Sequence, residues 1–329
     1  MVIITIILAL FFNFLNGAND RANALATTTA TGALPPIAAL LLTSVFNVLG
    51  AFASTRVAET IGKGIVPSAQ VTLPLLLTGV LGSIIWVFIC TSFGIPISVS
   101  HALVGGILGA GLMSGGKGII DWHIFNNKVL LAIVLGPGAG FLAGAFVLSV
   151  ISWTVHLFFK KLSTHKVNKF FLVGQIFTTP FMSFTHGMND TQNAMGIIAA
   201  ALLAGGITES FVVPWWVKIT CGVVMGVGTF LMGWRVVRTL GWELTKVEPQ
   251  HGFSAEFASG AVIGLHSLAG MPISTTHVVG STLLGGTALQ NWRRIKQTIA
   301  WKMIIAWVIT IPCAGAFAGL AHLIFNYLV

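Results

Sequence analysis

One short polar phrase occurs twice in this chain, each time inside an apolar stretch. The copies span residues 11–26 and 181–196 and match at two Phe, a Gly, an Asn-Asp pair and a later Asn-Ala pair. An unpaired carboxylate in an apolar environment costs several kcal/mol. Because the chain bears this cost twice, we expect both acids, Asp20 and Asp190, to serve its function.

The composition around these phrases indicates a membrane protein. Mean hydropathy is +0.92 and only 8% of residues are charged, whereas about a quarter are charged in soluble domains. Several apolar stretches can supply the roughly 20 residues that cross a hydrocarbon core. These stretches lie at residues 2–15, 36–53, 72–92, 129–158, 170–188, 211–234, 257–269 and 300–325. We therefore predict an all-α, multi-pass protein of the cell membrane.

The net charge of +9 does not indicate nucleic-acid binding, because the basic residues lie in short loops between the apolar stretches. Such residues set membrane topology and contact anionic lipid. The first apolar stretch has no Lys or Arg ahead of it and runs directly into the first polar phrase. We expect it to be retained as a helix rather than cleaved as a signal peptide.

Three further pairs of segments match in the same order, which indicates an internal duplication. Residues 56–62 match 235–241, residues 94–101 match 270–277, and residues 137–144 match 312–319. The predicted organisation is a first repeat at 1–158, a basic linker at 159–169 and a second repeat at 170–329.

Loop charge predicts how the two repeats are oriented. The linker carries four lysines, which marks it as cytoplasmic. The loops at 235–246 and 293–302 are richer in Lys and Arg than their counterparts at 56–63 and 117–128. Equivalent loops on opposite faces of the membrane explain this difference. We therefore predict inverted repeats of about five crossings each, with both termini outside.

The segments 94–113 and 270–288 predict discontinuous, re-entrant half-helices. Each is Gly-rich and opens with Pro and a cluster of hydroxyl residues, which suit a first turn and an N-cap. A helix that starts within the membrane presents free N–H groups to an oxyanion. The alternative is a kinked packing helix whose hydroxyls bond their own backbone. The candidate anion-binding residues are Ser98, Val99, Ser100, Ser274, Thr275 and Thr276.

The two Asn-Asp phrases and one further acid form the predicted cation-binding set. Clustered carboxylate and amide oxygens suit Na⁺ or a proton rather than a soft transition metal. Alternatively, each Asp caps a following half-helix. Glu256, the third intramembrane acid, is either a coupling-ion ligand or an interfacial ion-pair partner. The candidates are Asn19, Asp20, Asn23, Asn189, Asp190, Asn193 and Glu256, with Asp20, Asn23, Asp190 and Asn193 as the Na⁺ ligands.

Four accessory candidates lie near these motifs: Thr27, Gln192, His101 and His277. Each His follows a hydroxyl cluster at identical spacing. The two could handle protons or donate to an oxyanion, or they could be packed and neutral. Arg21, which follows Asp20, is expected to face the cytoplasm.

With these residues in hand, the chain resembles the PiT family of inorganic phosphate transporters. The resemblance rests on residues 17–24, 187–196, 252–256 and 272–277 and covers nearly the whole chain. It implies phosphate uptake with Na⁺ or H⁺, alternating access, a homodimer and no cofactor, and it makes Asp20, Asp190 and Glu256 the essential acids. Sodium-coupled animal members carry glutamate where this chain has Asn47.

Three alternatives remain beside a phosphate symporter. Some bacterial members of the same family carry sulfate. A passive anion channel would use the same half-helices. Two intramembrane aspartates could also form an aspartyl protease dyad, but Asn rather than Gly precedes each acid. We therefore expect a transporter and not an enzyme.

Overall fold

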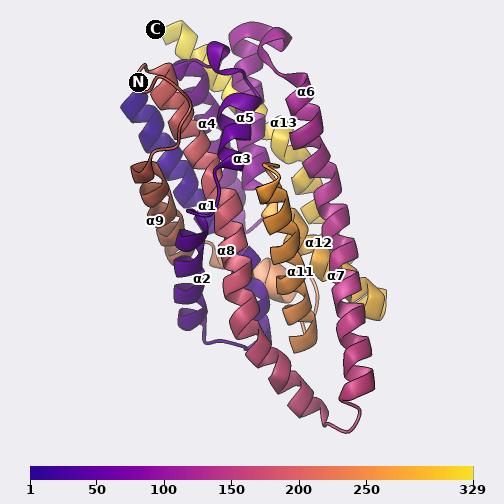
Figure 1. Ribbon diagram of the computed structural model, residues 1–329. Coiled ribbons are helices and arrows are strands. Elements are labelled where there is room, and N and C mark those ends of the chain that lie inside the picture. Colours follow the sequence, from indigo (N-terminus) through magenta and orange to yellow (C-terminus); the bar gives the residue numbers. More distant parts are fainter. Residues whose placement is uncertain (329) are drawn as a thin grey trace.

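The computed structural model describes residues 1–328, and every regular element among them is helical. The helices run roughly along one axis of an elongated bundle (Figure 1). α1 begins and α13 ends at the same end of this bundle, while the α7–α8 connection projects from the opposite end (Figure 1). The prediction of an all-α protein is confirmed.

The same series of helices occurs twice along the chain. The first series is α1 (Val2–Thr31), α2 (Pro36–Gly50), α3 (Arg56–Glu59), α4 (Leu73–Phe93), α5 (Val99–Gly115), α6 (Trp122–Ile124) and α7 (Leu131–Phe158). The second is α8 (Thr164–Ala204), α9 (Trp215–Leu231), α10 (Trp234–Arg238), α11 (Pro249–Leu268), α12 (Thr275–Asn291) and α13 (Gln297–Leu328). Only α6 has no counterpart helix in the second series, where a 3₁₀ turn at Trp292–Arg294 takes its place.

The two series pack in a reciprocal, interlocked way. α1 packs against α9 and α8 against α2; likewise α5 packs against α13 and α12 against α7. α1 and α8, the first helices of the two series, start at opposite ends of the bundle (Figure 1). These features support two repeats of opposite direction, although their placement across a membrane stays a prediction. The linker is shorter than expected, because residues 164–169 already belong to α8.

Five helical segments are long and apolar enough to cross a membrane: Val2–Thr31, Leu73–Phe93, Val99–Ile119, Trp122–Phe158 and Gln297–Leu328. A sixth arises if Trp215–Leu231 and Trp234–Glu243, bent by 66°, form one span. α8 and α11 are not in this group, and both carry many buried polar residues. The prediction of about five crossings in each repeat therefore stays a prediction.

The glycine of each repeated phrase allows two helices to touch backbone to backbone. A Cβ on Gly17 would lie 2.3 Å from the Met225 carbonyl oxygen, and one on Gly187 would lie 2.2 Å from the Asn47 carbonyl oxygen. Any side chain there would push the helices apart. These contacts hold α1 against α9 and α8 against α2, which fixes where the two Asn-Asp pairs lie.

Candidate functional site

Both predicted half-helix starts are present. α4 and α11 end just before Gly94 and Gly270, whose φ angles are +70° and +71°. After a short extended link, α5 and α12 begin, capped by Ser98 and Ser274, whose Oγ atoms accept from backbone N–H groups at 3.1 Å and 3.2 Å. We call residues 98–101 tip 1 and residues 274–277 tip 2.

The two tips lie next to each other although they are far apart in the sequence. The imidazole rings of His101 and His277, which occupy equivalent positions, meet edge to face with centroids 4.7 Å apart. Two helix N-termini therefore converge on one buried region, and each adds a partial positive charge there.

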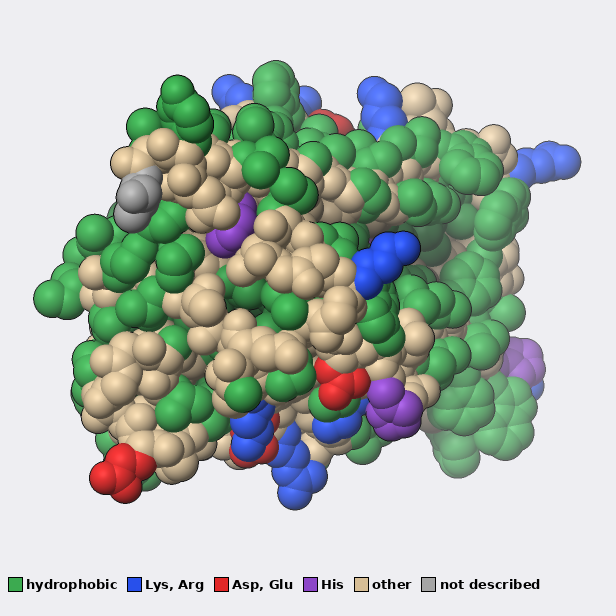
Figure 2. Space-filling model, turned by 90° about the horizontal axis from the view of Figure 1, so that it is seen from above, with side chains coloured by type: hydrophobic (Ala, Val, Ile, Leu, Met, Phe, Trp, Pro, Cys, Tyr) green, Lys and Arg blue, Asp and Glu red, His purple; other side chains and the backbone are tan. Residues whose placement is uncertain are grey.

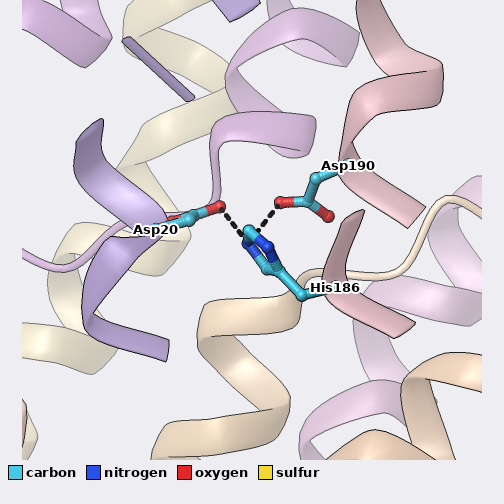
Figure 3. Close-up of side chains that lie close together, drawn as sticks. All are labelled: Asp20, His186 and Asp190. Atoms are coloured by element: carbon cyan, nitrogen blue, oxygen red, sulfur yellow. Dashed lines mark ion pairs between the residues drawn. The ribbon is translucent and has the colours of Figure 1, made fainter. Parts of the chain in front are cut away.

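The two signature acids meet at one centre with a histidine. His186 Nε2 lies 3.4 Å from Asp190 Oδ2 and 3.9 Å from Asp20 Oδ2, so its ring stands between the carboxylates (Figure 3). One ligand atom from each of the three residues lies within 4.8 Å of the others, and all three are buried. This acid centre combines two hard oxygen ligands with an imidazole nitrogen, a set that can hold a cation. The two acids that were predicted to hold separate cations therefore lie in one cluster.

Tip 2 is bonded directly to the acid centre. The Thr275 hydroxyl lies 3.1 Å from Asp190 Oδ2 and 3.4 Å from Asp20 Oδ2, and the Thr276 hydroxyl donates to Asp20 Oδ1 at 2.9 Å. Asn23 Nδ2 donates to both hydroxyl oxygens, at 3.0 Å and 3.1 Å. The hydroxyls that could bind an anion are therefore engaged by carboxylates.

Tip 1 has a simpler partner. Asn193 Nδ2 donates to Ser100 Oγ at 2.7 Å. Among residues 1–328, the side-chain oxygens of Asn19, Asn23 and Asn193 are buried without a hydrogen-bond partner. Because buried acceptors normally have partners, these oxygens are free to bind a cation. Asn189 differs, since its amide donates to Asp190 Oδ1 and Ile273 O and its oxygen accepts from Ser267.

A chain of hydrogen bonds sets the tautomer of His186. The Thr229 hydroxyl donates to Met225 O, so it accepts from Asn47 Nδ2. Asn47 Oδ1 is then the acceptor that faces His186 Nδ1 at 2.9 Å, and Nδ1 carries a proton. Nε2 is left to face the two carboxylates, either as a cation ligand or with a second proton as their counter-charge.

Glu256 lies in a separate cluster of hydroxyls. Thr27 and Thr28 of α1 donate to its Oε1 at 2.6 Å and 2.8 Å, and Thr178 and Thr179 of α8 donate to its Oε2. Its side chain is buried and makes no ion pair with any of residues 1–328. The alternative of an interfacial ion-pair partner is therefore wrong, because three packed helices enclose the carboxylate.

The accessory candidates play different parts. Thr27 contacts Glu256 rather than the acid centre. Gln192 Oε1 accepts from the Val57 and Ala58 N–H groups at 2.8 Å and 3.1 Å, so it caps α3 instead of joining the centre. His277 also packs on Trp307, with centroids 4.2 Å apart. Neither nitrogen of His101 or His277 has a hydrogen-bond partner within the described chain, which favours the packed, neutral alternative.

Arg21 is not exposed, as a residue that faces the cytoplasm would be. Its side chain is buried, donates to the Phe230 and Met232 carbonyls at 3.4 Å and 3.1 Å, and lies over the Trp234 ring. It satisfies free carbonyls where α9 ends, a position that favours a cation.

Three residues of these clusters escaped the sequence analysis: Thr178, Thr179 and His186. His186 could have been found, because it lies one helical turn before Asp190 on the same face. A comparison of the two phrases does not single out His186, because the equivalent residue of the first copy is Asn16. The threonines carry no such signal, because only the packing of α1, α8 and α11 brings them together.

Comparison with known proteins gives concordant matches. A sequence profile described as "Phosphate transporter family" matches residues 16–318. The chain is 39% identical to the "Probable low-affinity inorganic phosphate transporter" of Mycobacterium tuberculosis (strain ATCC 25618 / H37Rv), over 99% of this chain and 79% of that one. It is 37% identical to the protein of the same name from Bacillus subtilis (strain 168), over 99% and 97%. A solved structure, "The sodium-dependent phosphate transporter", superposes with a TM-score of 0.88 at 25% identity, over 100% and 99% of the two chains.

Proposed function

This chain belongs to the phosphate transporter family, and on that premise we propose that it carries inorganic phosphate across the cell membrane by symport with a cation. Membership confirms the resemblance inferred from the sequence, and it means that the protein is a transporter and not an enzyme. The relatives named above are described as inorganic phosphate transporters and the solved neighbour as sodium-dependent, so Na⁺ is the favoured coupling ion.

The observation that carries this proposal is the convergence of two carboxylates and two helix N-termini on one buried centre. Two carboxylates repel a phosphate anion, and they also occupy the Thr275 and Thr276 hydroxyls. A cation bound by Asp20 and Asp190 removes both obstacles. It lowers the combined negative charge of the acids, and by competing for their oxygens it releases the hydroxyls of tip 2 to donate to phosphate. Cation binding and phosphate binding then favour each other.

Alternating access is the second part of the proposal. Asp20, Asp190, Asn193, Ser100, Thr275 and Thr276 are all at most 2% exposed, so phosphate can reach the centre only after helices move. The reciprocal packing of the two series of helices gives two equivalent ways to open, one toward each face.

Glu256 is a second candidate position for a coupling cation. Its carboxylate is surrounded by four threonine hydroxyls, all hard oxygen ligands. We further propose a homodimer, on the resemblance alone, with both termini outside as the loop charges predict.

Radiolabelled phosphate uptake into proteoliposomes tests the function. An inward Na⁺ gradient at equal pH should drive phosphate above its equilibrium level, and unlabelled sulfate should compete poorly. Accumulation driven by a pH gradient alone would identify the proton as the coupling ion. Equilibration without accumulation under either gradient would show a passive channel and refute symport, and strong competition by sulfate would favour a sulfate permease.

A further inference from the structure

We propose that a basic cavity beside the link between α11 and α12 is an additional binding site for a phosphate oxyanion, at which the substrate is collected before it enters the centre. The cavity has a volume of 310 Å³, about ten times the ~30 Å³ share of one water molecule. This inference rests on the proposed function, because it assumes that phosphate is the substrate.

The charged residues of the cavity are Arg56, Glu59, Lys63 and Lys128. Lys63 Nζ lies 3.3 Å from Glu59 Oε2, and among residues 1–328 this exposed ion pair is the only one that compensates the three basic side chains. Lys128 makes no ion pair with any of the residues described. The cavity therefore has an excess of positive charge, which raises the local concentration of anions.

The wall of the cavity is the link that leads into tip 2. Arg56 donates to Leu268 O at 2.6 Å and the Thr60 hydroxyl to Gly270 O at 2.7 Å. Four residues beyond Gly270, Ser274 begins the tip whose threonines meet the acid centre. An oxyanion in the cavity would thus be separated from tip 2 only by this short link.

The equivalent cavity beside the α4–α5 link shows that this charge is not a by-product of the repeat. There, Arg235 donates to Ser92 O and the Thr239 hydroxyl to Gly94 O, at 2.7 Å and 3.0 Å, in the same arrangement. That cavity has 370 Å³, but its only charged lining residues are Glu243 and Lys302. Closing the link therefore explains Arg56, and Lys302 of the paired loop corresponds to Lys128, so Lys63 is the cation that the second cavity lacks.

The predicted membrane topology strengthens the case that the basic side chains of this cavity serve a function. Residues 56–63 and 117–128 belong to the loops predicted outside, where Lys and Arg are disfavoured. Of the four basic residues in these two loops, only Lys117 is not part of the cavity. α3 and α6, which frame it, lie in the half of the bundle where α1 begins (Figure 1). Seen from that end, most of the surface is apolar or uncharged, with the Lys, Arg, Asp and Glu side chains scattered in small groups (Figure 2).

Charge-neutralising variants test the site in proteoliposomes. Lys63→Gln with Lys128→Gln should raise the KM for phosphate about 3- to 10-fold at low ionic strength, with an unchanged maximal rate. The increase should shrink at high salt. Glu59→Gln, which makes the cavity more positive, should lower the KM. Lys117→Gln is the matched control for Lys128→Gln alone, because it makes the same change of one charge on the same loop but outside the cavity.

A KM in the double variant equal to that of Lys117→Gln would overturn the additional site while leaving the proposed function intact. If the wild type itself accumulates no phosphate under any gradient, it is the proposed function that fails.

Amine acylation of the reconstituted protein distinguishes free phosphate from a lipid headgroup. In phosphatidylcholine vesicles, added phosphate should slow the acylation of Lys128 relative to Lys117, as measured by mass spectrometry, whereas chloride of equal ionic strength should not. Protection that requires phosphatidylglycerol and is indifferent to added phosphate would assign the cavity to lipid and overturn the proposal.

Discussion

The two tips have the same backbone but different partners. Each is capped by a serine, and each carries a histidine three residues after the cap. Tip 2 is bonded to both carboxylates, whereas tip 1 accepts a hydrogen bond from the amide of Asn193 at Ser100 and has no bond to either acid among the residues described. One residue accounts for much of this difference, because Thr275 of tip 2 is Val99 in tip 1, and valine has no hydroxyl to donate to an acid. We infer that cations act on phosphate binding mainly through tip 2, while tip 1 serves as an anion-binding helix end.

The largest expected effect comes from removing either acid of the centre. Asp20→Asn or Asp190→Asn should each reduce phosphate uptake by about 100-fold or more, because a buried ligand charge is worth several kcal/mol. Uptake into proteoliposomes measures this loss, and the exposed Glu209→Gln is the control for a change of one charge. Transport at the wild-type level in either Asn variant would contradict the role of the acid centre.

The second-largest effect is expected at His186, where the two repeated phrases differ. His186→Asn makes the second phrase like the first, which carries Asn16 at the equivalent position. Without the imidazole between the carboxylates, the apparent affinity for the coupling cation should fall about 10- to 100-fold. Uptake measured against Na⁺ concentration, and separately against pH, gives this value. His101→Asn, outside the acid centre, is the control, and equal shifts in both variants would show that His186 has no special part.

A smaller effect tests the difference between the tips directly. Thr275→Val gives tip 2 the apolar residue of tip 1 and removes a hydroxyl from both acids. A lost bond to a charged group is worth about 1.5–3 kcal/mol. The factor by which saturating cation lowers the phosphate KM should therefore be about 10-fold smaller in this variant than in the wild type. Val99→Thr is the reciprocal control. If both variants keep the wild-type cation dependence, coupling does not act through tip 2.

The smallest effect is expected at tip 1. Ser100→Ala removes one neutral hydrogen bond, worth about 0.5–1.5 kcal/mol, so the KM for phosphate should rise about 2- to 10-fold. Cation dependence should stay unchanged, which uptake at several Na⁺ concentrations can verify. A changed cation dependence in this variant would mean that the two tips are not specialised.

Local patterns predicted the elements of the site well. Pro and Ser at 96–98 and 272–274 predicted helices that start at Val99 and Thr275, because a cap and the helix it begins are neighbours in the chain. Spacing on one helix likewise placed Asn23 with Asp20 and Asn193 with Asp190. Partners across helices were not predictable in this way. Gln192, three residues from Asn189, turned out to cap α3, since its side chain meets a helix from another part of the chain.

The amino-acid sequence by itself determined the class of this protein, its repeated helices, their interrupted starts and the two acids in apolar surroundings, because hydropathy, capping and periodicity act over a few residues. Only the tertiary structure decided that Asp20, His186 and Asp190 form one centre, that tip 2 rather than tip 1 is bonded to it, and that Glu256 is enclosed by threonines. Apart from the His186–Asp190 pair on one helix, those contacts join residues more than 70 positions apart. The close packing of helices at glycines such as Gly17 and Gly187 selects them.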